Sequence, residues 1–266
     1  MQAEILLPFT ELFEVWQKIE ATARPRRLLC GARPKIKMKQ IQELIKNKLP
    51  EEALALLANE FPERIVFSTS LGYEDQVISH IIFSNQLPID VFTLDTGRLF
   101  NETYSVLNNT LERYKTRIKV LYPQTEAIEK LVSEKGPISF YESLENRKEC
   151  CFIRKVEPLK RALKGKSIWV TGIRAEQSDN RHDMSNLEWD EANQIIKFHP
   201  ILNWTLEEVK LYISKHNIPY NSLHDKGFVS IGCAPCTRAI KEGEDFRAGR
   251  WWWEQHDKKE CGLHSR

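Results

Sequence analysis

The sequence predicts an α/β protein whose mostly parallel, twisted sheet carries helices on both faces. Two observations support this class. From Arg64 onward, short apolar stretches alternate with helix-length segments, and those segments place apolar residues at helical spacing. Strands separated by helices form parallel sheets covered on both sides. At 266 residues, the chain is long enough for one large domain or two small ones.

The expected elements follow from spacing and from turn residues. Val77, Ile78, Ile81 and Ile82 recur with helical periodicity, for example, and Asn203 or Thr205 can cap the last helix. We expect helices over 41–46, 51–59, 74–86, 101–115, 125–135, 151–164 and 204–215. We expect strands over 65–67, 89–94, 118–122 and 168–171, and a hairpin formed by 187–190 and 195–199.

Charge and hydropathy argue against nucleic acids and membranes as partners. Lys and Arg number 39 and Asp and Glu 37, a formal charge of +2. This balance predicts no nucleic-acid partner and no acidic membrane surface. No apolar run is long enough for a bilayer, and the first residues lack the order of a signal peptide. The expectation is a cytoplasmic protein without a membrane partner.

Three regions are expected along the chain. Residues 1–37 read as an N-terminal extension of unknown role, with a possible amphipathic helix followed by a basic patch. Residues 38–245 form the α/β domain, and residues 246–266 form a flexible C-terminal tail.

Three polar, glycine-bearing loops follow predicted strands. They are 68–75, 94–98 and 171–174, the last followed by Arg181. Ligands of open parallel sheets bind beyond the carboxyl ends of the strands. Free N–H groups at a helix N-terminus suit an anion. A capped strand-to-helix turn explains the first loop equally well, and the other two are weak signals alone, but the three together favour a nucleotide pocket.

Four of the six cysteines form two groups. Cys150 and Cys151 precede a predicted helix, and Cys233 and Cys236 form a distant Cys-x-x-Cys loop. In a reducing compartment such groups indicate metal or catalysis rather than disulfides. Four thiolates suit zinc or an iron–sulfur centre, and an adjacent Cys-Cys pair favours a 4Fe–4S cluster over zinc. A thioredoxin-like redox role for the Cys-x-x-Cys loop is the weaker interpretation.

A further cysteine, Cys261, lies in the polar tail with basic residues around it. Nearby cations favour the reactive thiolate, and Gly262 gives the backbone freedom beside the sulfur. A tail of this kind can carry a nucleophile into and out of a pocket. A surface cysteine in a frayed terminus is the plainer interpretation.

Five further segments are distinctive: Glu149-Cys150-Cys151-Phe-Ile-Arg154-Lys155, Pro219-Tyr-Asn-Ser-Leu-His224, Ile231-Gly-Cys233-Ala-Pro-Cys236-Thr-Arg238, Gly249-Arg250-Trp-Trp-Trp-Glu254 and Glu260-Cys-Gly-Leu-His264. Together these segments resemble the assimilatory adenylyl-sulfate reductases, relatives of the phosphoadenylyl-sulfate reductases. The resemblance runs from about residue 40 to His264. It implies an adenine-nucleotide α-hydrolase-like fold.

The resemblance also implies roles for individual residues. Cys261 would be the nucleophile, and Cys150, Cys151, Cys233 and Cys236 would hold a 4Fe–4S cluster. Substrate-binding residues would be Ser68, Ser70 and Asp75 at the phosphosulfate loop, Leu94 and Gly97 at the adenine, Arg174 and Arg181 nearby, and Lys155, Arg247, Arg250 and His264 as cations.

The implied reaction reduces adenylyl sulfate to sulfite and AMP through an S-sulfocysteine on Cys261, in sulfate assimilation and cysteine biosynthesis. No second cysteine adjoins Cys261, so an external dithiol, thioredoxin or glutaredoxin, is expected as reductant. The chain could form a homo-oligomer. The first loop has one glycine, Gly72, where the wider superfamily has a glycine pair, which argues against ATP chemistry.

Three alternatives stay open. Reduction of phosphoadenylyl sulfate, or of both substrates, is the first. An ATP-dependent sulfur or adenylyl transferase is the second, and it predicts exchange of ATP with pyrophosphate. A zinc-stabilised nucleotide-binding module is the third, and it predicts zinc in a colourless protein.

Overall fold

A computed structural model of the chain describes residues 34–177 and 184–254. Most of the predicted N-terminal extension lies outside these residues. Three predicted site residues, Arg181, Cys261 and His264, lie outside them as well.

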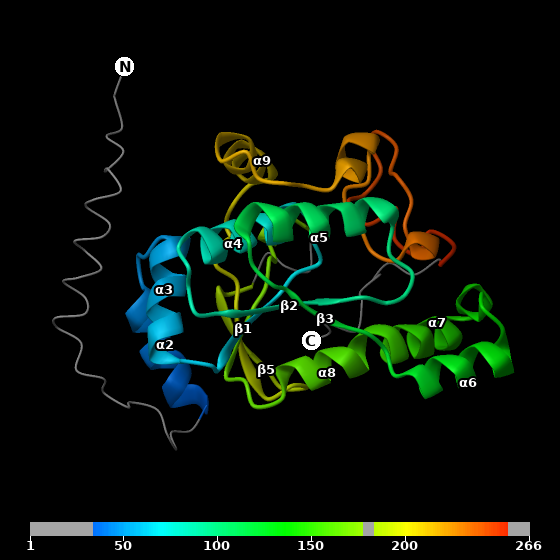
Figure 1. Cartoon of the computed structure of the whole chain (residues 1–266), viewed down its shortest axis with the longest axis horizontal. Coiled ribbons are helices and arrows are strands. Elements are labelled where there is room, and N and C mark those ends of the chain that lie inside the picture. The colour runs from blue at the N-terminus through cyan, green and yellow to red at the C-terminus, as the bar shows by residue number, and fades with distance from the viewer. Residues whose placement is uncertain (1–33, 178–183, 255–266) are drawn as a thin grey trace.

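The described elements follow the predicted order (Figure 1). The helices are α2 Pro34–Ile45, α3 Pro50–Glu60, α4 Tyr73–Ser84, α5 Asn101–Tyr114, α6 Thr125–Lys135, α7 Leu144–Cys151, α8 Glu157–Leu163 and α9 Leu206–Lys215. The strands are β1 Ile65–Ser68, β2 Asp90–Leu94, β3 Lys119–Leu121, β4 Ile168–Val170, β5 Leu187–Asp190 and β6 Ile195–Phe198. Short helical turns cover Ser139–Tyr141, Ala175–Gln177, Ser222–Lys226 and Ala234–Cys236.

The strands form one six-stranded sheet in the order β3-β2-β1-β4-β6-β5. All neighbouring pairs are parallel except β5 and β6, which form the predicted antiparallel hairpin. The chain first builds outward from β1 to β3 and then returns to the other side of β1 with β4. The predicted fold class is confirmed, and the reversal between β1 and β4 is the point where such sheets bind ligands.

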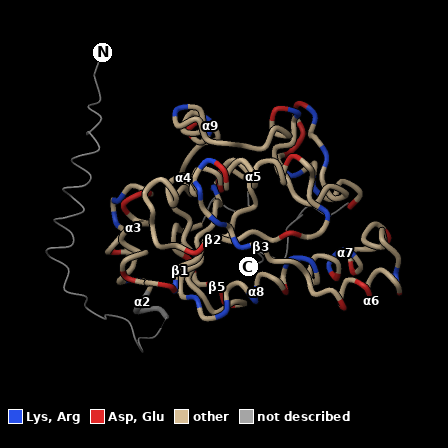
Figure 2. Tube along the Cα trace, viewed as in Figure 1, with Lys and Arg blue, Asp and Glu red and all other residues tan. Residues whose placement is uncertain are grey.

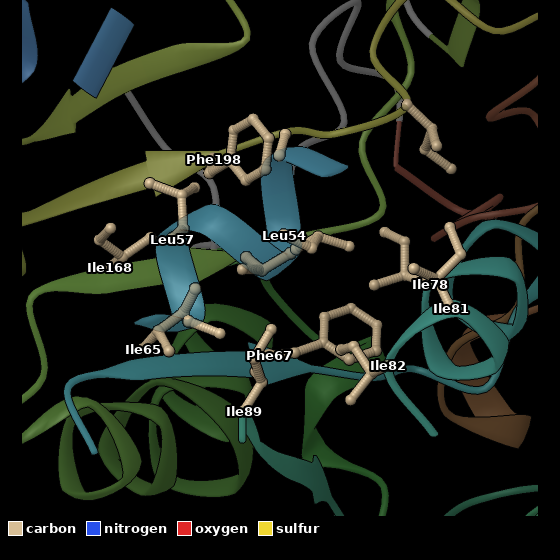
Figure 3. Packing of buried hydrophobic residues seen from close by; sticks show 14 of the residues in the cluster. Leu54, Leu57, Ile65, Phe67, Ile78, Ile81, Ile82, Ile89, Ile168 and Phe198 are labelled. Atoms are coloured by element: carbon tan, nitrogen blue, oxygen red, sulfur yellow. The ribbon is translucent and has the colours of Figure 1, made fainter. Parts of the chain in front are cut away.

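Helices cover both faces of the sheet. Successive side chains of a strand point to opposite faces, and apolar side chains of β1 are buried on each. Ile65 and Phe67 of β1 belong to a large core with α2, α3, α4 and α9 (Figure 3), whereas Val66 packs with Leu159 and Leu163 of α8 on the other face. Figure 1 shows α4 and α5 on one side of the sheet and α8 on the other.

Local signals set the helix ends. Thr205 caps α9 in a capping box with Glu208, which decides between the two predicted caps. The predicted helix over 151–164 begins earlier, at Leu144, where the Ser143 hydroxyl accepts a hydrogen bond from the Asn146 amide. The same run contains a π-helical segment, Phe152–Val156, between α7 and α8. Such wide turns often occur at functional sites.

Acidic and basic residues are interspersed over the described chain (Figure 2). Among its helices, none combines the length and the apolar character needed to cross a bilayer.

Candidate active site

A cleft opens at the carboxyl ends of β1, β2 and β4. Its lining includes seven of the predicted substrate-binding residues, namely Ser68, Ser70, Asp75, Leu94, Lys155, Arg247 and Arg250. They come from positions almost 200 residues apart in the sequence. Of the remaining predictions, Gly97 and Arg174 are not among the lining residues, and Arg181 and His264 lie outside the described residues.

The loop after β1 is closed by Asp75. The Ser70 amide and the Ser70 hydroxyl both donate to Asp75 Oδ2, at 2.5 and 2.6 Å. Burial raises the pKa of Asp75 to about 6, and these hydrogen bonds only partly counteract it. The Asp75 carboxyl group therefore fixes the conformation of the loop at Ser70.

The loop after β4 approaches Asp75 closely. A Cβ on Gly172 would stand 2.1 Å from Asp75 Oδ1, so only glycine fits there. Thr171 and Gly172 both line the cleft. The first and third predicted loops therefore meet at one carboxylate, directly at the reversal of strand order.

The loop after β2 is shaped by Asp95. Gly97 adopts a φ of 70° and donates its amide to Asp95 Oδ1 at 2.8 Å. The neighbouring Thr96 carbonyl accepts from Arg154 Nη1 at 2.6 Å, which joins this loop to the π-helical segment. Leu94, at the end of β2, reaches the cleft.

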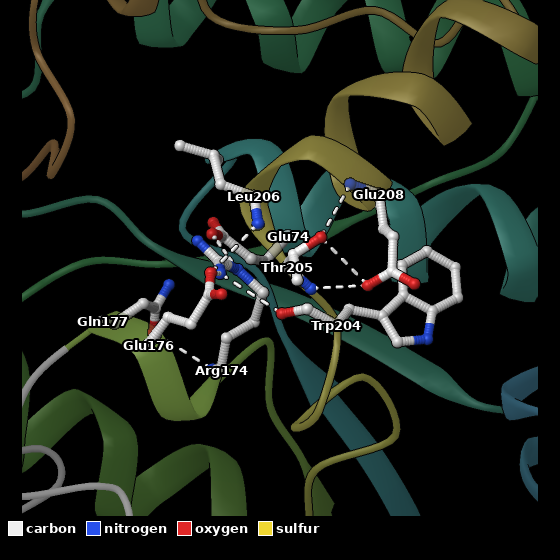
Figure 4. Close-up of polar contacts among 8 residues, drawn as sticks. All are labelled: Glu74, Arg174, Glu176, Gln177, Trp204, Thr205, Leu206 and Glu208. Carbon is white, nitrogen blue, oxygen red and sulfur yellow. Dashed lines mark hydrogen bonds and ion pairs between the residues drawn. The ribbon is translucent and has the colours of Figure 1, made fainter.

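Arg174 is buried, and it takes part in a network of ion pairs and hydrogen bonds (Figure 4). Its Nε pairs with Glu74 at 2.8 Å and its Nη1 with Glu176 at 2.8 Å, and its side chain is 1% exposed. Glu176 also accepts from the Leu206 amide at the start of α9. Arg174 thus braces the first turn of α4, and with it Glu74, which does line the cleft.

Three cationic side chains line the cleft. They are Lys155 from the π-helical segment and Arg247 and Arg250 from the C-terminal part of the described chain. Arg250 is 6% exposed, and its guanidinium packs against Gly232 so closely that a Cβ there would stand 2.4 Å from Nη2. Fixed cations beside hydroxyl-bearing loops suit a phosphate or sulfate group.

Sequence reasoning did not single out Trp169 or His224 as members of the site. Trp169 lies in the middle of β4, lines the cleft and donates its Nε1 to Ser68 Oγ at 2.8 Å. His224 stacks on Tyr73, with ring centroids 3.9 Å apart, and its Nδ1 donates to the Phe228 carbonyl. Their contacts join segments far apart in sequence, so only the fold could reveal them.

The four cysteines of the two groups come together beside the cleft. Cys150, Cys233 and Cys236 are each 8% exposed and share one apolar cluster with Phe140 and Trp251. Cys151 is partly exposed, and it influences the ionisation of Cys236. The two groups, about 80 residues apart in sequence, therefore meet in one place.

The surroundings of these thiols are cationic. Burial opposes ionisation of Cys233, but Lys155, the Thr96 hydroxyl and Arg250 outweigh it and lower the pKa of this thiol. Burial, together with Cys233 and Cys151, raises the pKa of Cys236 to about 12. Bringing several thiolates together is therefore costly unless a positively charged group binds them.

Comparison with protein families decides the class. The family model of the phosphoadenosine phosphosulfate reductase domain matches residues 64–239. The chain belongs to this reductase family. The match extends from the start of β1 past the Cys-x-x-Cys loop, so it includes the three loops and the four cysteines of the two groups.

Curated members of the reductase family are similar over most of their length. A protein of Allochromatium vinosum named adenosine 5'-phosphosulfate reductase is 52% identical over 81% of this chain and 84% of its own. One of Burkholderia cepacia with the same name is 48% identical, over 80% and 85%. The resemblance found in the sequence is confirmed.

Solved structures confirm the fold. A phosphoadenylyl-sulfate reductase of Candida auris, in complex with phosphate, superimposes with a TM-score of 0.66 at 28% identity, covering 79% of this chain and 98% of that one. Yeast FAD synthetase shares the fold alone, with a TM-score of 0.50 at 16% identity, covering 88% and 77%.

Proposed function

We propose that this reductase converts adenylyl sulfate to sulfite and AMP, with Cys261 as the nucleophile and thioredoxin as the reductant. The observation that carries the proposal is the position of Arg247 and Arg250 in the wall of the cleft. These residues bring the chain to the cleft shortly before Glu254. Cys261 follows seven residues later, and an extended chain of that length spans at most about 25 Å.

The first step is a displacement at sulfur. The Cys261 thiolate attacks the sulfur of the phosphosulfate, a new S–S bond forms, and the bond from sulfur to the bridging oxygen breaks. AMP leaves with that electron pair. Lys155, Arg247 and Arg250, which line the cleft, stabilise the charge that develops on the phosphosulfate oxygens. His264 and Arg181 are proposed as further ligands.

The second step is a thiol exchange. One thiolate of the reductant attacks Cys261 Sγ, and sulfite leaves with the electron pair of the S–S bond. The second thiol of the reductant then displaces Cys261 and restores its thiolate. The dithiol thereby supplies both electrons, which accounts for the need for thioredoxin or glutaredoxin.

We also propose that Cys150, Cys151, Cys233 and Cys236 hold a 4Fe–4S cluster. In the part of the chain that the structure describes, no three His, Cys, Asp or Glu side chains are placed to bind one metal ion. A cluster differs, because each of its irons takes one cysteine and the sulfurs stand farther apart. Three buried thiols among Lys155, Arg250 and Arg154 fit that donor set.

When bound, the cluster would supply fixed charge and structure beside the substrate. The part played by the chain itself is to place Lys155 between the cysteines and the cleft: its charge lowers the pKa of Cys233, and its side chain lines the cleft. The Lys155 amine can therefore offset negative charge on the cysteine thiolates and on a substrate bound in the cleft.

Adenylyl sulfate is favoured over its 3'-phosphorylated form by the comparisons. Relatives named for adenosine 5'-phosphosulfate are about half identical to this chain, whereas the Candida auris phosphoadenylyl-sulfate reductase is 28% identical. The ratio of kcat/KM for the two substrates tests this choice. We further propose that the protein acts in the cytoplasm.

A turnover assay tests the proposal. Protein purified without oxygen should release sulfite and AMP in equal amounts from adenylyl sulfate and reduced thioredoxin. Cys261→Ser should release neither while binding AMP with unchanged affinity. Sulfite formation by that variant, or exchange of ATP with pyrophosphate by the wild type, would instead favour a different reaction.

A further inference from the structure

We infer that the buried ion pair between Arg147 and Glu254 positions the C-terminal tail, by fixing the point from which residues 255–266 continue. It thereby sets how far and in which direction Cys261 can reach. The inference rests on the proposed role of Cys261, and it concerns two residues with no assigned part in the reaction.

The pair has the geometry of a specific clamp. Arg147 Nε lies 2.7 Å from Glu254 Oε1, and Arg147 Nη2 lies 2.9 Å from Oε2. Each side chain is only 6% exposed. A two-pronged contact between a planar guanidinium and a carboxylate fixes orientation as well as distance.

The turn that contains Glu254 is held from several sides. Trp251 is 1% exposed, and its amide donates to the Cys236 carbonyl at 3.2 Å. The guanidinium of Arg147 lies 4.5 Å from the centre of the Trp251 ring, and that of Arg250 lies 4.7 Å from it. The Glu254 amide then donates to the Trp251 carbonyl at 2.9 Å.

Stability alone does not explain why a charged pair is buried here. Taking two charges out of water costs about as much as their attraction returns, so a buried pair is weak support for stability and better suited to fixing one geometry. A second pair in the same region, Arg238 and Glu244, is also two-pronged but is 35% and 30% exposed. Of these two pairs, the buried one therefore holds Glu254, which lies seven residues before Cys261.

The ion pair connects the C-terminal tail to the helix that carries two of the cysteines. Arg147 belongs to α7, the helix that also carries Cys150 and Cys151, and it interacts electrostatically with Cys151. One helix therefore sets the position of two of the cysteines and of the origin of the tail. A shared rigid support is what a precisely assembled site requires.

The number of residues between the anchor and Cys261 gives an estimate of how strongly the ion pair affects the reaction of this thiol. If the anchor retreats from Glu254 to Arg250, the segment before Cys261 grows from seven to eleven residues. For a flexible linker, effective concentration falls roughly as the −3/2 power of length, which between seven and eleven residues is about twofold. Loss of a fixed direction adds to this, since small misplacements at a reacting atom can slow a reaction by up to about 100-fold.

Glu254→Gln tests the inference, because it removes one charge without changing size and leaves Arg147 beside Cys151. The rate of adduct formation on Cys261 is measured by quenched-flow and intact mass, with saturating adenylyl sulfate and no reductant. We expect this rate to fall by about five- to fiftyfold. Iron content and AMP affinity should stay at wild-type values, and the matched variant Glu244→Gln should react at the wild-type rate.

An unchanged adduct rate in Glu254→Gln would overturn the inference. So would a parallel loss of iron and AMP affinity, which would mean a purely structural role. Absence of any adduct in the wild type would instead contradict the proposed function. A second measurement then still tests the clamp: trypsin should cleave after Arg250 faster in Glu254→Gln than in wild type or Glu244→Gln, and equal rates would refute it.

Discussion

Arg174 and Glu74 form a buried ion pair, with 2.8 Å between Nε and Oε1, that joins the loop after β4 to the first turn of α4. The two residues are 100 positions apart, and they bring together the two loops that flank the reversal of strand order. The pair explains why Arg174, a cationic residue near the cleft, is not among the residues that line it. Its charge is used to hold the cleft wall.

Replacing Arg174 by Met should therefore be costly. The variant leaves the carboxylate of Glu74 largely buried without its partner, and the free energy of unfolding should fall by about 3–5 kcal/mol. Urea unfolding measures the loss. The matched variant is Lys46→Met, whose pair with Glu43 is 63% and 74% exposed and should change stability by less than about 0.5 kcal/mol. Equal losses in both variants would contradict the account.

Gly172→Ala should damage the site rather than the fold. The added Cβ would collide with Asp75 Oδ1 and displace the carboxyl group from Ser70. We expect AMP affinity, measured by calorimetry, to fall by about tenfold or more, the effect of losing one or two good hydrogen bonds in the loop. Gly243→Ala is the control: nothing lies within 4 Å of its Cβ position, so its φ of 83° should cost stability while AMP affinity stays at the wild-type value. Wild-type affinity in Gly172→Ala would show that the close approach is unimportant.

Asp75 should make stability depend on pH in one direction. Burial raises its pKa from 3.8 to about 6, so the native state binds this proton more tightly than the unfolded chain does. Its contribution to the free energy of unfolding therefore falls as the pH rises from about 4 to about 6 and is constant above. Relative to wild type, Asp75→Asn should gain up to about 3 kcal/mol between pH 4 and pH 7. If the free energy of unfolding of the two proteins changed with pH in the same way, Asp75 would not have the raised pKa.

Cys236→Ser should lose the proposed iron–sulfur cluster. With one buried ligand missing, we expect little iron or inorganic sulfide after anaerobic purification, and a lower Tm because α7 and the 233–236 loop are no longer joined. Cys30→Ser, at a position outside the described residues, should keep both. If Cys236→Ser retains the iron, or if the wild type contains zinc instead, the proposed cluster is wrong.

The sequence predicted the fold well because periodicity is a local property. The helix over 125–135 was expected with the bounds that α6 has, and the strands around Phe67 and Phe92 were found within two residues of their predicted limits. The π-helical segment was not expected. It follows the Cys150-Cys151 pair in a run where Pro158 supplies no amide hydrogen, and spacing alone reads such a run as one ordinary helix.

The site was predicted less evenly, because its members depend on contacts between distant residues. Loop glycines and hydroxyls such as Gly72 and Ser70 carry a local signal, and they do line the cleft. Arg174 carries the same local signal, but it pairs with Glu74 and does not line the cleft. Trp169 reads as an ordinary strand residue, and only the pairing of β1 with β4 brings it to Ser68.

The most direct test of the central claim is the intact mass of the protein after anaerobic incubation with adenylyl sulfate in the absence of any thiol. We expect a single added sulfonate that maps to Cys261, and reduced thioredoxin should remove it with release of sulfite. If protein that contains iron and binds AMP gains no mass, or gains it on another residue, the result would contradict Cys261 as the nucleophile.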